Sequence, residues 1–120
     1  MANILVVEDD LQIRGLLLRV LAREHHTGDV ATNGDEALQR IEEREYAAIV
    51  LDLMLPTKTG IDVIEHLRVS RPELLPRIIV ITASQPAMKH PPPGIGGFFA
   101  KPFDLPELTK AITRVVGGEG

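Results

Sequence analysis

The chain has 120 residues, a length typical of one domain built around a single hydrophobic core. Its composition, 44% hydrophobic and 25% charged, is typical of a globular protein and argues against a disordered or membrane-embedded chain. The absence of cysteine excludes disulfides and thiolate metal sites, and a net charge of −4 without a basic run argues against direct binding of nucleic acid. We expect one cytoplasmic domain over residues 1–120, with a core at about 3–116, a tail at 117–120 and no membrane contact.

Short apolar runs rich in β-branched residues predict five strands, at 3–7, 29–32, 47–51, 77–81 and 98–100. Apolar residues at helical spacing predict four helices, at about 11–24, 35–44, 61–71 and 105–116, and Asp10 is the predicted N-cap of the first. Because strands and helices alternate, we predict an α/β fold whose doubly wound parallel sheet carries helices on both faces.

The segment between the fourth and fifth strands departs from this alternation. It holds four prolines and three glycines between residues 83 and 97. Proline inside a helix removes a hydrogen bond and clashes with the preceding turn. We therefore predict that Ala83 to Gly97 is largely irregular, with at most one turn near 87–89, so that a fourth helix is short, irregular or absent.

Polar side chains follow four of the predicted strands: Glu8 and Asp9 after the first, Asp52 on the third, Thr82 after the fourth and Lys101 after the fifth. The carboxyl ends of parallel strands share one edge of the sheet, so these groups should converge. Three neighbouring carboxylates repel one another unless a cation is bound, and carboxylates, water and a phosphate oxygen are the usual ligands of Mg²⁺. A carboxylate beside a metal can also attack phosphorus. The pattern indicates phosphoryl acceptance on Asp52, with Lys101 and Thr82 binding the phosphoryl oxygens.

These motifs resemble those of the response-regulator receiver domain of two-component signalling, over about Asn3 to Val116. The matching segments are 4–10, 49–56 with Gly60, 79–83 and 99–103. The resemblance implies a flavodoxin-like fold with the five strands in the order 2-1-3-4-5. It also implies a phosphoprotein that takes its phosphoryl group, as 4-aspartylphosphate, from a sensor histidine kinase or a histidine phosphotransfer protein.

The resemblance further implies a metal site for Mg²⁺ or Mn²⁺. Asp9, Asp52 and the backbone carbonyl of Met54 would bind the metal, and Glu8 would complete the acidic pocket or act through a water molecule. Asp52 would be the phosphoacceptor.

The same resemblance implies a switch around the phosphoryl group. Thr82 corresponds to the switch hydroxyl, Lys101 to the phosphoryl-binding lysine and Phe98 to the switch aromatic residue. It also implies a cis peptide bond before Pro102.

The expected function is that of a signalling module, in which phosphorylation switches the binding of a downstream effector protein or domain. The domain would be either a stand-alone regulator or part of a longer one, and the resemblance also allows a homodimer. It would not be a conventional enzyme, although Met54, which cannot position a water by hydrogen bonding, predicts slow self-dephosphorylation. The irregular segment puts the family's usual output and dimerisation face in doubt.

Other functions stay open as alternatives. A receiver-like adaptor that acts without phosphorylation would tolerate a short, irregular or absent fourth helix, although the acidic pocket, Thr82 and Lys101 argue against it. A phosphatase with an aspartate nucleophile would need a second aspartate where Met54 stands, which argues against it. A flavin or dinucleotide carrier of this topology would need a glycine-rich loop in place of Glu8, Asp9 and Asp10.

Overall fold

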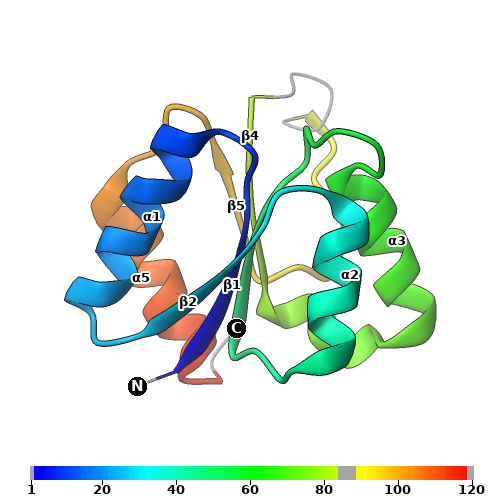
Figure 1. The fold of residues 1–120 in the computed structure, drawn as a ribbon, viewed down its shortest axis with the longest axis horizontal. Helices are drawn as coiled ribbons and strands as arrows, with labels where there is room; N and C mark the ends of the chain where they lie inside the picture. Colours follow the sequence, from blue (N-terminus) through cyan, green and yellow to red (C-terminus); the bar gives the residue numbers. More distant parts are fainter. Residues whose placement is uncertain (1, 84–88, 119–120) are drawn as a thin grey trace.

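The computed structural model describes residues 2–83 and 89–118 and forms a sheet with helices on both faces (Figure 1). The strands are β1 (Asn3–Val7), β2 (Thr27–Ala31), β3 (Ala48–Asp52), β4 (Ile78–Thr82) and β5 (Gly97–Ala100). The helices are α1 (Leu11–Arg23), α2 (Gly34–Glu43), α3 (Gly60–Ser70) and α5 (Leu105–Val116), with a 3₁₀ helix, η1, at Pro72–Arg77. All five strands run parallel in the order β2-β1-β3-β4-β5, which confirms the predicted fold class and strand order.

The sheet separates two hydrophobic cores. Alternate residues of each strand point to opposite faces, so Leu5 and Val7 of β1 pack with α2 and α3, whereas Ile4 and Val6 pack with α1 and α5 (Figure 1). Both faces of the central strands are therefore covered. This explains why β1, β3 and β4 consist of continuous apolar runs and do not alternate with polar residues.

Side-chain caps fix where the helices begin. The carboxylate of Asp10 accepts hydrogen bonds from the N–H groups of Gln12 and Ile13, as predicted. Thr59 and Asp62 form a capping box at the start of α3. These caps fix the first turns of α1 and α3, the helices that follow β1 and β3 in the chain.

Two elements differ from the sequence prediction. Strand β2 begins at Thr27, two residues earlier than predicted, because Gly28 leaves room for the helix above it: a Cβ on this residue would lie 2.7 Å from Cδ2 of Leu18. Helix η1 was not predicted. It forms because Leu74 and Leu75 are buried in the core beside α3.

The predicted irregular segment falls partly outside the described residues, which omit 84–88. In the part that is described, residues 93 and 94 form a turn in which Gly94 has a φ of +86°, a conformation that favours glycine. Arg68 of α3 donates a hydrogen bond to the carbonyl of Pro93 at 3.0 Å and so attaches this turn to the helix. The absence of a regular fourth helix stays a prediction.

Tyr46 links the start of β3 to β2. This residue is 2% exposed, and its hydroxyl donates to Oδ2 of Asp29 at 2.7 Å. Burial, reinforced by the neighbouring Asp29, raises the pKa of Tyr46 to about 12, and the hydrogen bond from Tyr46 lowers the pKa of Asp29.

Replacing Tyr46 with phenylalanine should therefore have two effects. The folded domain should lose about 1 kcal/mol of stability, because one hydrogen bond to a charged group is removed while Asp29 keeps Arg44 as a partner. The pKa of Asp29 should rise. When the pH is lowered, the variant should therefore lose the stabilising contribution of the Asp29 carboxylate at a higher pH than the wild type does. Urea denaturation and NMR titration of Asp29 measure the two effects. An unchanged pKa of Asp29 would contradict the second.

Candidate functional site

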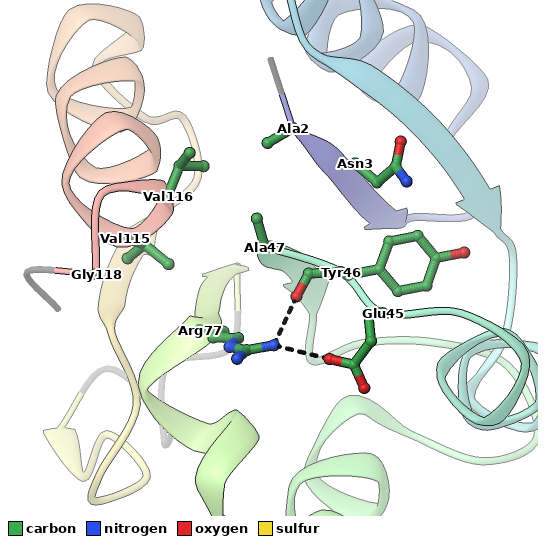
Figure 2. A pocket seen from close by; sticks show the side chains of 9 residues that line it. All are labelled: Ala2, Asn3, Glu45, Tyr46, Ala47, Arg77, Val115, Val116 and Gly118. Carbon is green, nitrogen blue, oxygen red and sulfur yellow. Dashed lines mark hydrogen bonds and ion pairs between the residues drawn. The ribbon is translucent and has the colours of Figure 1, made fainter.

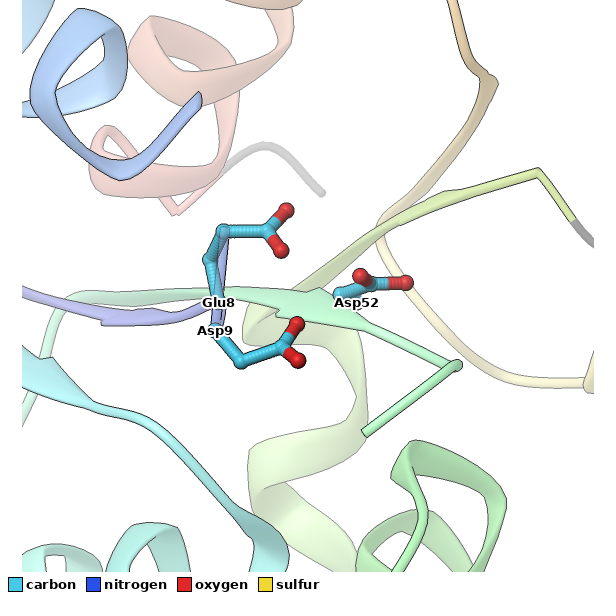
Figure 3. Close-up of side chains that lie close together, drawn as sticks. All are labelled: Glu8, Asp9 and Asp52. Carbon is cyan, nitrogen blue, oxygen red and sulfur yellow. The ribbon is translucent and has the colours of Figure 1, made fainter. Parts of the chain in front are cut away.

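The polar residues that follow the strands meet at one edge of the sheet. Glu8 and Asp9 come directly after β1, Asp52 ends β3, and Lys101 follows β5. One carboxylate oxygen from each of Glu8, Asp9 and Asp52 lies within 4.8 Å of the other two. Figure 3 shows the three carboxylates gathered beside the ends of β1 and β3. The predicted convergence of these acids is therefore present.

Lys101 bridges two of the three acids. Its ammonium nitrogen lies 2.9 Å from Oε1 of Glu8 and 2.9 Å from Oδ2 of Asp52. The side chains of Glu8 and Asp52 are 0% and 4% exposed, so these ion pairs are largely shielded from water. Burial alone would lower the pKa of Lys101, but its hydrogen bonds to Asp52 and Glu8 raise the pKa overall. The lysine is therefore a fixed cation within the pocket.

Both carboxylate oxygens of Glu8 are held by the chain itself. Oε1 accepts from Lys101, and Oε2 accepts from the backbone N–H of Asp10 at 3.1 Å. Burial nevertheless raises the pKa of Glu8 above its usual value, since the bonds from Lys101 and Asp10 only partly offset the loss of solvent. Asp9, by contrast, is exposed at the mouth of the pocket. Asp9 is thus better placed than Glu8 to bind a ligand directly.

Asp52 is oriented from two sides. Its Oδ1 accepts a hydrogen bond from the N–H of Met54 at 3.0 Å, and its Oδ2 contacts Lys101. The Met54 side chain is 57% exposed and makes part of the rim, so only its backbone takes part in holding the carboxylate. The Asp52 carboxylate therefore has a defined orientation toward the space beside Asp9.

Thr82, Phe98 and Pro102 complete the set of predicted site residues. The side chain of Thr82 is fully buried at the end of β4, and its carbonyl accepts a hydrogen bond from the N–H of Lys101 at 2.8 Å. Phe98 is partly buried and packs against the core on the α2 and α3 side. The peptide bond between Lys101 and Pro102 is cis.

The loop after Asp52 is held by two close backbone contacts. The N–H of Gly60 donates to the carbonyl of Leu53, and the N–H of Gly34, at the start of α2, donates to the carbonyl of Lys58, both at 3.0 Å. A Cβ on Gly34 would lie 2.3 Å from that carbonyl oxygen. Sequence reasoning did not identify this contact. The Asn-Gly pair gives no sign of which distant carbonyl it approaches.

Comparison with known proteins decides the family. The sequence matches the response regulator receiver domain over residues 4–113. The chain belongs to the receiver domain family. It is 37% identical over 119 residues to the transcriptional regulatory protein TcrA of Mycobacterium tuberculosis, covering 93% of this chain and 46% of TcrA. It is also 37% identical over 118 residues to ResD of Bacillus subtilis, covering 93% of this chain and 48% of ResD. The receiver domain thus spans less than half the length of these relatives.

Solved structures agree with this assignment. The response regulator TrrA of Thermotoga maritima, in complex with Mg²⁺-BeF, superposes with a TM-score of 0.82 at 28% identity, over 96% of this chain and 99% of TrrA. The receiver domain of the sensor histidine kinase PA1611 of Pseudomonas aeruginosa, with a magnesium ion in its active site cleft, superposes with a TM-score of 0.85 at 25% identity, over 97% of this chain and 98% of that domain.

The donor set of this receiver domain fits a hard divalent cation. All the candidate ligands are oxygens, and the three acids and Lys101 together carry a formal charge of −2. Because Lys101 neutralises only part of the acidic charge, a divalent ion beside Asp9 and Asp52 would balance the rest. The chemistry of these residues therefore matches Mg²⁺ or Mn²⁺.

A pocket of about 440 Å³ lies at the opposite, amino-terminal edge of the sheet (Figure 2). Arg77 lies beside it and donates to the carbonyl of Tyr46 at 3.0 Å and to Oε2 of Glu45 at 3.3 Å. None of the predicted site residues lines this pocket. Arg77 is engaged in joining the start of β4 to the segment before β3, which is a structural role.

None of the described helices has the length and apolar composition that crossing a membrane requires.

Proposed function

We propose that this receiver domain is a phosphoacceptor, in which Asp52 takes a phosphoryl group from a phosphohistidine on a sensor histidine kinase or a histidine phosphotransfer protein. The observation that carries the proposal is the orientation of the Asp52 carboxylate. It is fixed by the N–H of Met54 and by Lys101, and it lies beside Asp9 at an open edge of the sheet. This arrangement orients the carboxylate of the proposed nucleophile toward the space beside Asp9.

The proposed transfer is a displacement at phosphorus. A carboxylate oxygen of Asp52 attacks the phosphorus atom, the P–N bond to the donor imidazole breaks, and the imidazole nitrogen leaves and takes up a proton. The product is an acyl phosphate on Asp52. Lys101, already 2.9 Å from Asp52, would exchange that contact for one with a phosphoryl oxygen, and the buried Thr82 hydroxyl would bind another.

The proposed metal is Mg²⁺ or Mn²⁺, bound by Asp9, Asp52 and the backbone carbonyl of Met54, with Glu8 acting through the acidic pocket or a water molecule. When bound, it neutralises charge on the phosphoryl oxygens during the transfer. The chain's own part is to orient Asp52 and to supply a fixed cation in Lys101.

The proposed outcome is a change in the binding of a downstream effector protein or domain in the cytoplasm. Reorientation of Thr82 and Phe98 upon phosphorylation would change the surface near β4 and β5. We propose no conventional enzyme activity beyond self-dephosphorylation. This hydrolysis should be slow, because the apolar side chain of Met54 cannot position a water molecule.

Adduct formation tests this function. Incubation with Mg²⁺ and acetyl phosphate should add one phosphoryl group, detected by intact mass, and Mg²⁺ with beryllofluoride should shift the NMR signals of residues around Asp52. Asp52→Asn should abolish both changes, and so should removal of the metal with EDTA. Asp35→Asn, which removes an exposed carboxylate on α2, is the matched control and should behave as wild type.

Failure of the wild-type protein to form either adduct would refute the phosphoacceptor function. That result would favour the adaptor alternative, in which the receiver fold binds a partner without phosphorylation. An adduct that persists in Asp52→Asn would mean that another residue accepts the phosphoryl group.

A further inference from the structure

The loop between β3 and α3 carries a backbone segment that has two tasks in the proposed site. The N–H of Met54 donates to Oδ1 of Asp52 at 3.0 Å, and the carbonyl of Met54 is a proposed ligand of the metal. The Met54 side chain is 57% exposed, so its own packing does little to hold this backbone. The position of Met54 therefore depends on how the rest of the loop is held.

The tip of this loop is held by the start of α2. The N–H of Gly34 donates to the carbonyl of Lys58 at 3.0 Å. The two backbones lie so close that a Cβ on Gly34 would be 2.3 Å from the carbonyl oxygen and 2.9 Å from the carbonyl carbon of Lys58. Gly34 is buried and its φ is not positive, so glycine is required here for space.

The backbone next to this contact is strained. Thr57 has a φ of +59°, which is rare for a β-branched residue. Such a conformation persists only where the surrounding structure imposes it. Thr57 is exposed, and its hydroxyl donates to the carbonyl of Pro56 within the same loop, so side-chain packing does not impose it. The contact of Gly34 with the following residue, Lys58, accounts for the strain.

The chain from the loop tip back to Met54 is stiff. Leu55 is buried in the core beside α2 and α3, and the ring of Pro56 fixes its φ. The loop is also closed at its base, since the N–H of Gly60 donates to the carbonyl of Leu53 at 3.0 Å. With few free dihedral angles and a packed interior beside it, the loop should pass a displacement of its tip on to Met54.

We propose that Gly34 is a positioning residue for the Met54 backbone. Its N–H and its missing side chain allow α2 to hold the loop tip at Lys58, and the stiff chain carries that position to the N–H and carbonyl of Met54. Gly34 itself contacts neither the phosphoryl group nor the metal. This inference rests on the proposed function, because it concerns the Mg²⁺ site proposed there, and it adds a residue from a helix that supplies no ligand.

Gly34→Ala tests this role, and Gly96→Ala is its matched control. A Cβ on Gly96 would lie 2.2 Å from the carbonyl oxygen of Pro76, so both alanines press on a backbone carbonyl to a similar degree. Gly96 lies at the opposite edge of the sheet, where its N–H donates to the carbonyl of Ile78 at the start of β4. Each variant should lower the melting temperature by about 5–15 °C.

Two NMR measurements on the folded variants separate positioning from stability. In the metal-free protein, Gly34→Ala should move the amide proton signal of Met54 upfield, because the displaced loop lengthens the hydrogen bond to Asp52. In a titration with Mg²⁺ alone, the same variant should raise the dissociation constant by about tenfold. Gly96→Ala should leave the Met54 signal and the dissociation constant at their wild-type values.

Asp35→Asn distinguishes the backbone contact from the ion pair beside it. This variant removes the exposed pair between Lys58 and Asp35, which are 3.4 Å apart, and keeps the N–H of Gly34. It should bind Mg²⁺ as the wild type does. An Asp35→Asn protein that lost as much Mg²⁺ affinity as Gly34→Ala would show that the ion pair holds the loop, and would overturn the proposal.

Hydrogen exchange in the wild-type protein tests the same coupling if Gly34→Ala does not fold. Because coupling between two sites is reciprocal, Mg²⁺ should in turn stabilise the contact at Gly34. At about ten times its dissociation constant, Mg²⁺ should slow exchange of the Gly34 N–H by about tenfold. Denaturant concentrations at which this exchange does not vary restrict the measurement to local opening of the loop.

The possible results distinguish this inference from the proposed function. Equal Mg²⁺ affinity of wild type and Gly34→Ala, or exchange of the Gly34 N–H that Mg²⁺ does not slow, would overturn the inference and leave the phosphoacceptor function intact. An equal loss of affinity in Gly96→Ala would overturn it as well, since the effect would then follow from stability alone. A wild-type protein that binds no Mg²⁺ would overturn the proposed metal site together with the inference.

Discussion

Replacing Lys101 with methionine is expected to destabilise the folded domain by about 2–4 kcal/mol at pH 7, because removing one partner of a buried ion pair leaves the other partner uncompensated. Glu8 would keep only the N–H of Asp10 as a donor while remaining fully buried. Among the described residues, Asp52 would keep only the N–H of Met54 as a donor. Urea denaturation of the metal-free protein measures the loss.

The loss should depend on pH in a defined direction. The pKa of Glu8 is already raised above its usual value of 4.5 by burial, and the hydrogen bond and charge of Lys101 partly lower it. Without Lys101 the folded-state pKa of Glu8 rises further, so the folded state holds this proton more tightly than the unfolded state does. The contribution of Glu8 to the stability of the variant should therefore be greatest below about pH 4.5 and fall as the pH rises through the raised pKa of Glu8.

A double variant provides the control for the Lys101 prediction. Glu8→Gln in the Lys101→Met background removes the buried charge, so the double variant should be more stable at pH 7 than Lys101→Met alone and less dependent on pH. Equal stability of wild type and Lys101→Met between pH 4 and pH 7 would show that the ion pairs contribute nothing to folding.

Replacing Gly60 with alanine is expected to cost about 3 kcal/mol of stability and to slow phosphorylation of Asp52. The new Cβ would lie 2.5 Å from the carbonyl oxygen of Asp52 and 2.6 Å from Cα of Leu53. Both are backbone atoms, so the end of β3 and the start of α3 must move apart, as in an overpacked core. Because Asp52 carries the proposed nucleophile, this shift should also change the orientation of its carboxylate.

Gly97→Ala is the matched control, since a Cβ on Gly97 would have ordinary contacts at 3.5–3.7 Å. Its stability should lie within about 0.5 kcal/mol of wild type. Denaturation midpoints and the rate of adduct formation with acetyl phosphate compare the two variants. A Gly60→Ala protein as stable and as reactive as Gly97→Ala would mean that the loop adapts without strain.

The sheet could be predicted from sequence because both of its faces are buried. Strands of that kind read as continuous apolar runs, and each such run here ends at a polar residue, which marks the edge where the site lies. Asp52 was identifiable for this reason: it is the single charge that interrupts the apolar stretch from 47 to 55. The capping role of Asp10 was predictable because it depends only on residues two and three positions away.

Other features depended on contacts that local sequence does not encode. Lys101 and Glu8 are 93 residues apart, so the bridge between them follows only once the sheet is assembled. Helix η1 was missed because its two prolines are typical of a loop and its two adjacent buried leucines show no helical period. The close approach of Gly34 to Lys58 likewise arises from the packing of α2 against the loop after β3.

Asp10 has two roles that belong to different parts of the molecule. Its side chain holds the first turn of α1, and its N–H holds Oε2 of Glu8 in the acidic pocket. A ligand that drew Glu8 toward itself would leave this N–H without its acceptor and would loosen the start of α1. We therefore expect the pocket to favour ligands that bind through Asp9 and Asp52 and leave the hydrogen bond between Glu8 and Asp10 intact.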